Sequence, residues 1–259
     1  MTRYAFENVW ELARRRLALL EQSADPATVT WLRRLGVGEG WHCWEVGAGG
    51  GSIVRWLAEA VGGTGYVLAT DIDTRHLEDI QAPNVEFRSH DVVQDPLPST
   101  PFDLIHTRLV LMHLPAREEV LLRLVSALRP GGWLLLEEHD IFPVHALARD
   151  HYSRVWRGVE AVVQATGARS DWGRELPHLL GTHGLDDVGA EALAPLFPGG
   201  SASAEFWRLS WEQIRQPLLA SGVAPKDLDN AMSDLQDPGQ WFTAPAMVSA
   251  WGRRSLATS

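Results

Sequence analysis

The sequence predicts an α/β fold in which a doubly wound, mostly parallel sheet carries helices on both faces. From Trp41 to about Glu138, short apolar runs alternate with amphipathic stretches, which is typical of strands joined by helical crossovers. The first apolar run ends in a glycine-rich turn, "WEVGAGGGS" at 44–52, and folds of this class bind their ligands beside such turns. We therefore expect the functional site at the carboxyl ends of the strands.

Hydrophobic periodicity predicts the elements in order. Residues 1–40 are predicted as two amphipathic helices with a break near "SADPAT" (23–28). Five apolar runs of strand length follow, and they are 42–46, 66–70, 85–89, 102–107 and 133–138. The helices predicted between these strands are 52–61, 74–80 and 116–128. The last of them should end at "RPGG", because proline and glycine stop a helix.

The rest of the chain is less regular. Helices are predicted at 145–167 and 203–222, and strands at 186–193 and 244–254. No obvious linker divides this region from the sheet, so we expect a single domain, residues 1–259. Its predicted parts are N-terminal helices (1–40), a cofactor-binding core (41–140), a lid (141–183) and C-terminal strands and helices (184–259).

Composition narrows the classes of function. The 259 residues have a formal net charge of −10, which disfavours a nucleic-acid partner because phosphate binding needs clustered Lys and Arg. No run approaches the roughly 18 apolar residues of a membrane span, and the charged N-terminal stretch differs from a signal peptide. Cys43 is the only cysteine, so we expect a packed small side chain in a protein of the reducing cytoplasm.

Three neighbouring strands are followed by carboxylates, which favours a cationic ligand. Glu45 precedes the glycine loop (residues 47–51), Asp71 ends the second strand, and Asp91 follows the third. A dinucleotide would bring a phosphate close to Glu45, and two like charges about 4 Å apart repel by about 4 kcal/mol at an intermediate dielectric. The dinucleotide motif G-x-G-x-x-G is also imperfect, because Ser52 takes the last glycine position. An adenosine carrying positive charge suits these residues better.

Taken together, the motifs resemble those of class I S-adenosylmethionine-dependent methyltransferases. They cover about residues 30–140 in the expected order, and they are "EVGAGGG" (45–51), the acids after the second and third strands, "FDLIHTRLVLMHL" (102–114) and "LRPGGWLLLEE" (128–138). The resemblance implies a Rossmann-like sheet of seven strands with an antiparallel last strand, to which the last two predicted strands would belong. The N-terminal helices and the lid are similar to those of actinobacterial small-molecule (natural-product) methyltransferases.

The resemblance also implies which residues would hold the cofactor, S-adenosylmethionine. The glycines would pack against its methionine part, Glu45 would lie near the ammonium group, and Asp71 would hold the ribose hydroxyls. The full set of implied cofactor residues is Glu45, Gly47, Gly49, Gly51, Asp71, Ile72 (against the adenine), Asp91 (at the adenine amine), Val92 (through its backbone), and Thr107 and Arg108 (bordering cofactor and substrate). Asp73 is predicted instead as the N-cap of the helix at 74–80.

Methyl transfer requires an aligned acceptor and can proceed without a catalytic side chain. The candidates for such a side chain are His139 and Asp140 just past the fifth strand, and His113 in "LVLMHL" (109–114). An imidazole suits a general base, although His139 is equally expected as a hydrogen-bonded loop residue. A metal site at 138–140 is disfavoured, because consecutive strand residues point in different directions; no metal is expected.

Aromatic side chains are frequent in the predicted lid region. They could line an apolar pocket for a small ligand, but their helical spacing also fits packing into a core, which is the favoured interpretation for most of them. These residues are Tyr152, Trp156, Trp172, Phe197, Phe206, Trp207 and Trp211.

The hypothesis from the sequence is methyl transfer to a small, uncharged or weakly charged molecule, in secondary metabolism. Oxygen is the first choice of acceptor atom, with nitrogen and carbon open. The alternatives are an NAD-dependent oxidoreductase, which Glu45 disfavours, and a nucleic-acid methyltransferase, which the acidic charge and "HTRL" (106–109) disfavour. A scaffold of pericyclase type, binding the cofactor without methyl transfer, stays open. So does the choice between monomer and homodimer.

Overall fold

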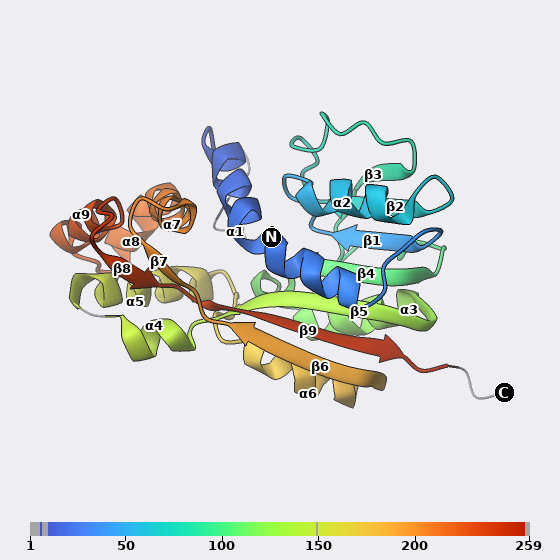
Figure 1. Cartoon of the computed structure of the whole chain (residues 1–259). Helices are drawn as coiled ribbons and strands as arrows, with labels where there is room; N and C mark the ends of the chain where they lie inside the picture. The colour runs from blue at the N-terminus through green and yellow to red at the C-terminus, as the bar shows by residue number, and fades with distance from the viewer. Residues whose placement is uncertain (1–5, 7–9, 149, 257–259) are drawn as a thin grey trace.

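The computed structural model describes residues 6, 10–148 and 150–256, and its central element is one seven-stranded sheet (Figure 1). The order across the sheet is β3-β2-β1-β4-β5-β9-β6, and β9 runs antiparallel to both of its neighbours. The strands are β1 His42–Val46, β2 Tyr66–Asp71, β3 Val85–Ser89, β4 Phe102–Arg108, β5 Leu128–Asp140, β6 Leu185–Leu193 and β9 Ala246–Arg254. The predicted fold class is confirmed, including the antiparallel strand.

Alternation along β1 sends neighbouring side chains into different layers of helices. Cys43 packs into the apolar cluster that α2 (Ser52–Val61) and the end of α1 (Ala13–Arg34) form on one face. Trp44 packs into the cluster of α3 (Arg117–Ala127) and α6 (Leu176–Thr182) on the other. Both faces of the sheet are therefore covered by helices, and Cys43 is a fully buried small side chain, as expected.

A third apolar cluster lies beside the sheet, and we call the elements that form it the lid (Figure 1, left). The lid comes from two separate stretches of chain, and its elements are α4 Phe142–Leu147, α5 Asp150–Ala165, β7 Leu196–Pro198, α7 Ala202–Gln213, α8 Arg215–Ala220, α9 Pro225–Asp234 and β8 Trp241–Thr243. The predicted lid at 141–183 therefore differs from the observed one. From that range α6 packs on the sheet instead, because Leu176 and Leu180 join the sheet's apolar cluster.

The first helix is continuous from Ala13 to Arg34, so the predicted break near 23–28 is wrong. Pro26 lies inside α1 and removes a backbone donor from it. Contacts with the sheet hold the helix on either side of this proline. Asp25 accepts from Arg108 across 2.9 Å, and Thr28 donates to Glu137. Such tertiary contacts outweigh the local preference for a helix break that the sequence pattern indicates.

The segment 74–80 forms a series of turns, so the predicted helix there is wrong as well. Its backbone bonds join residues three apart, from the Leu77 N–H to Thr74 and from the Ile80 N–H to Leu77. A stretch this short gains little from helix formation. Leu77 and Ile80 pack against Gly51 instead.

Each of the two long helices predicted for the lid is divided in two. The stretch 145–167 falls into α4 and α5, because the backbone at Ala148 is extended with ψ 144°. The stretch 203–222 falls into α7 and α8. In the second case Pro217 has no N–H to donate to the carbonyl of Gln213, where α7 ends.

The strand β9 joins the outermost strand, β6, to the rest of the sheet. β9 lies between β5 and β6, and eight residue pairs join it to β5, from Trp133–Arg253 to Asp140–Ala246. β6 is the outermost strand, and β9 is its only partner among the described strands.

Candidate functional site

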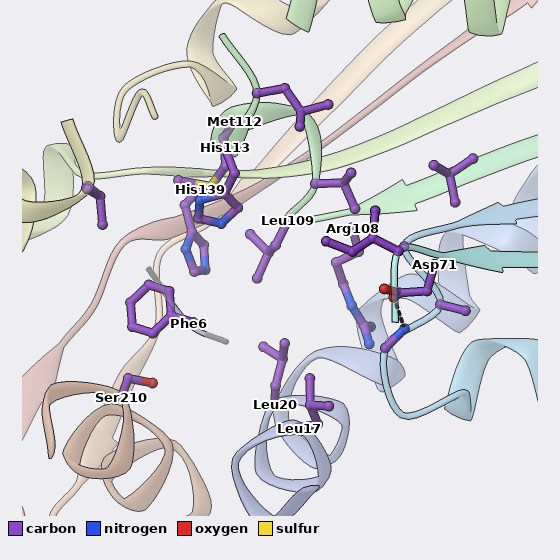
Figure 2. Close-up of a pocket in the computed structure, with 18 of the residues that line it drawn as sticks. Phe6, Leu17, Leu20, Asp71, Arg108, Leu109, Met112, His113, His139 and Ser210 are labelled. Atoms are coloured by element: carbon purple, nitrogen blue, oxygen red, sulfur yellow. Dashed lines mark hydrogen bonds between the residues drawn. The ribbon is translucent and has the colours of Figure 1, made fainter. Parts of the chain in front are cut away.

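A cavity of about 950 Å³ opens at the carboxyl ends of the parallel strands, between the sheet, α1 and the lid. Figure 2 shows part of its lining, including residues on opposite sides of the cavity. Asp71 and Arg108 extend from the strands at one side, and His113 and His139 lie together at the other. Leu109, just past the end of β4, lies between them, as do Leu17 and Leu20 of α1. We call the two parts the carboxylate end (Glu45, Asp71, Asp91) and the aromatic end (His113, His139, Trp156, Phe206, Trp207).

The glycine loop folds tightly over the ends of β1 and β2. Gly47 has φ +73° and Gly49 has φ +56°, values that side chains other than glycine rarely adopt. A Cβ on Gly47 would lie 2.3 Å from Val110. Gly47 and Gly49 both line the cavity. Gly51 is required for packing instead, since its Cβ would lie 2.3 Å from Ile80, and it does not line the cavity.

Asp71 is fixed by backbone donors at the carboxylate end. Its two oxygens accept the N–H groups of Gly49 and Asp73, each at 3.0 Å (Figure 2 shows the bond from Gly49). Burial raises the pKa of Asp71, although these two hydrogen bonds oppose the rise. Beside it, Ile72 is 66% exposed and lines the cavity, so an apolar side chain is left for a flat ligand to cover.

Asp91 and Val92 lie past β3 on the same side of the cavity. Asp91 accepts from the Val93 N–H and from the Gln94 side chain, each at 2.9 Å, so its position is fixed without a ligand. Asp73 also lines the cavity, but the helix that it was predicted to cap is absent. Its carboxylate binds Arg75 instead, at 2.8 Å from Nε.

Glu45 belongs to a buried ion triad that the sequence reasoning missed, formed by Glu45, His106 and Glu137. His106 Nδ1 lies 2.7 Å from Glu45 Oε2, and His106 Nε2 lies 3.2 Å from Glu137 Oε2. Burial by itself would favour a neutral ring, but the two carboxylates raise the pKa of His106 to about 9. The signal in the sequence was a polar residue inside the apolar strand "FDLIHTR".

The triad is linked to α1 and β9. Glu137 accepts from Ser249 Oγ at 2.6 Å and from Thr28 of α1. Arg108, which was predicted to border cofactor and substrate, lines the cavity and donates to Thr28 (3.0 Å) and Asp25 (2.9 Å). Thr107 was predicted to share that border, but it is fully buried in β4 and is not part of the cavity wall.

The aromatic end holds two neutral histidines. Burial, and to a smaller extent His113, lowers the pKa of His139 to about 3. Burial, followed by Arg16 and Arg117, lowers the pKa of His113 to about 4. The His139 ring lies 5.6 Å from that of Trp207. Both imidazoles line the cavity and are uncharged at neutral pH.

Asp140 does not reach the cavity, unlike the two histidines predicted with it. It is fully buried, and it accepts from Arg174 Nε at 2.6 Å and from the Phe142 N–H at 3.0 Å. Its neighbour Glu138 accepts the Leu111 N–H at 2.8 Å and fixes the turn that carries His113. Strand alternation explains the difference, because Asp140 and His139 point to opposite sides of β5.

The predicted aromatic residues divide between cavity and core. Trp156, Phe206 and Trp207 line the cavity. The others are buried without lining it, as the favoured interpretation expected, and they are Tyr152, Trp172, Phe197 and Trp211. Packing therefore accounts for most of the set.

In the part of the chain that the structure describes, the His, Cys, Asp and Glu side chains form no group of three or more with the arrangement needed to hold a metal ion. The helices of this described part include none with the length and apolar character that crossing a membrane requires.

Comparison with known proteins finds a similarity in the central part of the chain. Residues 44–136 match the family described as a methyltransferase domain. Methyltransferase str2 of Strobilurus tenacellus is 32% identical over 151 residues, which are 56% of this chain and 53% of the relative. The chain thus spans about half the length of this curated relative. Str2 is fungal, so the similarity to actinobacterial enzymes stays a prediction.

Solved structures share the methyltransferase fold. Phosphoethanolamine N-methyltransferase 2 of Haemonchus contortus, in complex with phosphomonomethylethanolamine and S-adenosylhomocysteine, has a TM-score of 0.61 at 15% identity, over 97% of this chain and 59% of that one. The [4+2]-cyclase SpnF has a TM-score of 0.54 at 16% identity, over 91% of this chain and 82% of that one. These likenesses bear on the fold alone.

The carboxylate end of the cavity fits S-adenosylmethionine, the cofactor that the sequence resemblance implies. The buried carboxylate of Asp71 is held ready for a diol, and the exposed Ile72 offers an apolar face to an adenine ring. Glu45 lines the cavity and supplies a carboxylate where the sulfonium and the ammonium group of this cofactor would lie.

Proposed function

We propose that the protein transfers a methyl group from S-adenosylmethionine to a small molecule, with an oxygen as the favoured acceptor atom. The observation that carries this proposal is the single cavity that joins the carboxylate end to the aromatic end. A donor held at the first end would have its methyl group directed at a molecule held at the second. The bound cofactor supplies an activated methyl on sulfur, and the protein's main task is alignment, which contributes on the order of 7–11 kcal/mol.

Each residue at the carboxylate end would bind a different part of the cofactor. Asp71 and Ile72 would hold the ribose and cover the adenine, and Asp91 would accept from the adenine amine. Glu45 would attract the ammonium group, with the glycine loop against the methionine part. Leu17 and Leu20 of α1 would exclude water from the transfer path, because they form the opposite wall.

The aromatic end favours an uncharged or weakly charged, flat acceptor. Trp156, Phe206 and Trp207 give it apolar walls. His139, with a pKa of about 3, is a weak base, so it would accept a hydrogen bond from an acceptor hydroxyl and orient it before transfer. As the O–CH3 bond forms and the S–CH3 bond breaks, the hydroxyl proton would pass to His139 and from there to solvent. This role suits phenols and enols, whose own hydroxyl groups ionise readily.

The setting that we propose is secondary metabolism in a reducing cytoplasm. The relative str2 is a methyltransferase by name, and Cys43 is fully buried. Burial raises the pKa of the Cys43 thiol, so the thiolate needed for disulfide exchange is disfavoured.

A scaffold role, in which the cofactor stays bound and its methyl is not transferred, is the second candidate. The observation that favours it is that neither histidine of the aromatic end is a strong base, since both have pKa values far below neutral. The same fold is found in the [4+2]-cyclase SpnF.

Methyl transfer is tested with cofactor labelled in the methyl group and a panel of phenols, enols and amines. We expect label in a phenolic or enolic product, together with S-adenosylhomocysteine in equal amount. Stable binding of the cofactor with no labelled product from any acceptor, while a conjugated substrate is rearranged, would support the scaffold instead. Amine products alone would overturn the choice of oxygen.

A further inference from the structure

His106 is the least expected residue of the site. It lies in the middle of a central strand, it is fully buried, and it is not part of the cavity wall. Glu45, directly beside it, does line the cavity. His106 therefore stands behind the carboxylate that a ligand would contact, and any effect on the ligand must pass through Glu45.

The partners of His106 define its protonation state. Each ring nitrogen faces a carboxylate oxygen, at 2.7 Å for Glu45 and 3.2 Å for Glu137. Carboxylates accept hydrogen bonds, and a neutral imidazole has only one N–H to donate. A doubly protonated ring satisfies both neighbours, in agreement with the pKa of about 9. At neutral pH the ring therefore carries a positive charge and can donate to both neighbours.

We propose that His106 is a positioning residue, which keeps Glu45 turned toward the ammonium group of S-adenosylmethionine. His106 binds one oxygen of Glu45 and leaves the other to the ligand. Without that hydrogen bond, the side chain of Glu45 would be free to turn away from the ammonium group. The inference rests on the cofactor and is independent of the acceptor.

Glu137 gives His106 a fixed position from behind. It is itself held by Ser249 of β9 at 2.6 Å and by Thr28 of α1. α1 and β9 thus meet at Glu137, and through His106 they set the position of Glu45. The imidazole cannot turn away from Glu45 without losing its contact with Glu137 at the same time.

Two substitutions distinguish the contact of His106 with Glu45 from its contact with Glu137. The amide nitrogen of Asn is as many bonds from Cα as Nδ1, so His106→Asn keeps a donor toward Glu45. The amide nitrogen of Gln corresponds to Nε2, so His106→Gln keeps a donor toward Glu137 only. Both replacements are neutral, buried amides, which makes each the control for the other.

The probes are S-adenosylhomocysteine and 5′-methylthioadenosine, which lacks the amino-acid part, and the measurement is calorimetric titration of the full chain. We expect His106→Gln to weaken S-adenosylhomocysteine on the order of tenfold, the effect of losing a hydrogen bond to a charged group. Binding of methylthioadenosine should not change. His106→Asn should keep most of the affinity for S-adenosylhomocysteine.

Equal losses for the two probes would overturn the inference, because a merely structural role would weaken both. So would equal effects of the Asn and Gln variants. If neither variant folds, ¹⁵N NMR of the wild-type histidines decides: a ring that stays doubly protonated near pH 8 supports the inference, and its absence overturns it. Failure of the wild type to bind S-adenosylhomocysteine would overturn both the cofactor assignment and the inference. Failure to methylate acceptors would affect the proposed function alone.

Discussion

Arg108 at the end of β4 donates to Asp25 of α1 across 2.9 Å, so an ion pair joins the first helix to the sheet at the edge of the cavity. The pair is largely shielded, with 10% of the Arg108 side chain and 26% of the Asp25 side chain exposed. α1 also supplies Leu17 and Leu20 to the cavity wall. The position of this helix therefore bears on both stability and binding.

Replacing Asp25 should weaken the attachment of α1. We expect Asp25→Ala to lower the free energy of unfolding by about 1–3 kcal/mol, because Arg108 loses a charged partner in a partly buried site. The affinity for S-adenosylhomocysteine should fall with it. Urea unfolding and calorimetric titration measure the two effects. The control is Asp79→Ala, since the pair Arg14–Asp79 is about two-thirds exposed and should contribute nothing measurable. Equal effects of the two variants would contradict the prediction.

Asp71 should contribute more to cofactor binding than Asp73. Both line the cavity, but Asp71 is held by two backbone donors and Asp73 is bound to Arg75. We expect Asp71→Ala to reduce the affinity for S-adenosylhomocysteine by about tenfold or more, the effect of losing bonds to an ionised acceptor. Asp73→Ala should have a much smaller effect. Titrations that give the same affinity for both variants would remove Asp71 from the ribose site.

His139→Ala should lower turnover about tenfold while cofactor affinity stays nearly the same, because His139 lies at the other end of the cavity from Asp71. The pKa of His139 is lowered to about 3, so its ring is neutral above that pH. The rate between pH 5 and 7 should therefore show no titration near 6.5, the ordinary value for histidine.

The control for His139 is His178→Ala, on the exposed surface of α6, which should leave turnover unchanged. Unaltered turnover in His139→Ala would return His139 to a structural role. An acidic limb near pH 6.5 that disappears in that variant would show a proton-accepting base instead.

Glu138 should make stability fall as pH rises. Burial raises its pKa from 4.5 to about 8, so the folded protein holds this proton more tightly than the unfolded chain does. Its contribution is complete below about pH 4.5 and is lost as pH rises through about 8. We expect Glu138→Gln, which resembles the protonated form, to flatten the fall in unfolding free energy across this range. Urea unfolding at a series of pH values tests it. Parallel curves for the two proteins would refute the assignment.

The sheet could be predicted from the sequence because its strands are short apolar runs between turn signals. Periodicity placed β1 to β5 and the last two strands of the sheet within a few residues of their observed bounds. Periodicity failed where contacts between residues far apart in the sequence determine the local structure. The continuity of α1 through Pro26 depends on Arg108 and Glu137, which lie far along the chain. The turns at 74–80 depend likewise on packing against Gly51.

The carboxylate end was predictable for a related reason: the residue that ends each parallel strand lies at one edge of the sheet. This rule placed Asp71 and Asp91 at the cavity. It could not show what lies behind Glu45, because His106 is adjacent only through the pairing of β1 with β4. Nor could it separate His139, which faces the cavity, from Asp140, which binds Arg174.

The place of β9 between β5 and β6 has a consequence for biosynthesis. β6 emerges from the ribosome about fifty residues before β9, yet β9 is its only partner among the described strands. During that interval β5 and β6 both present unpaired backbone edges, which are prone to pair with other chains. Once β9 has been translated, it can pair with both β5 and β6. This pairing covers the two exposed edges and completes the seven-stranded sheet.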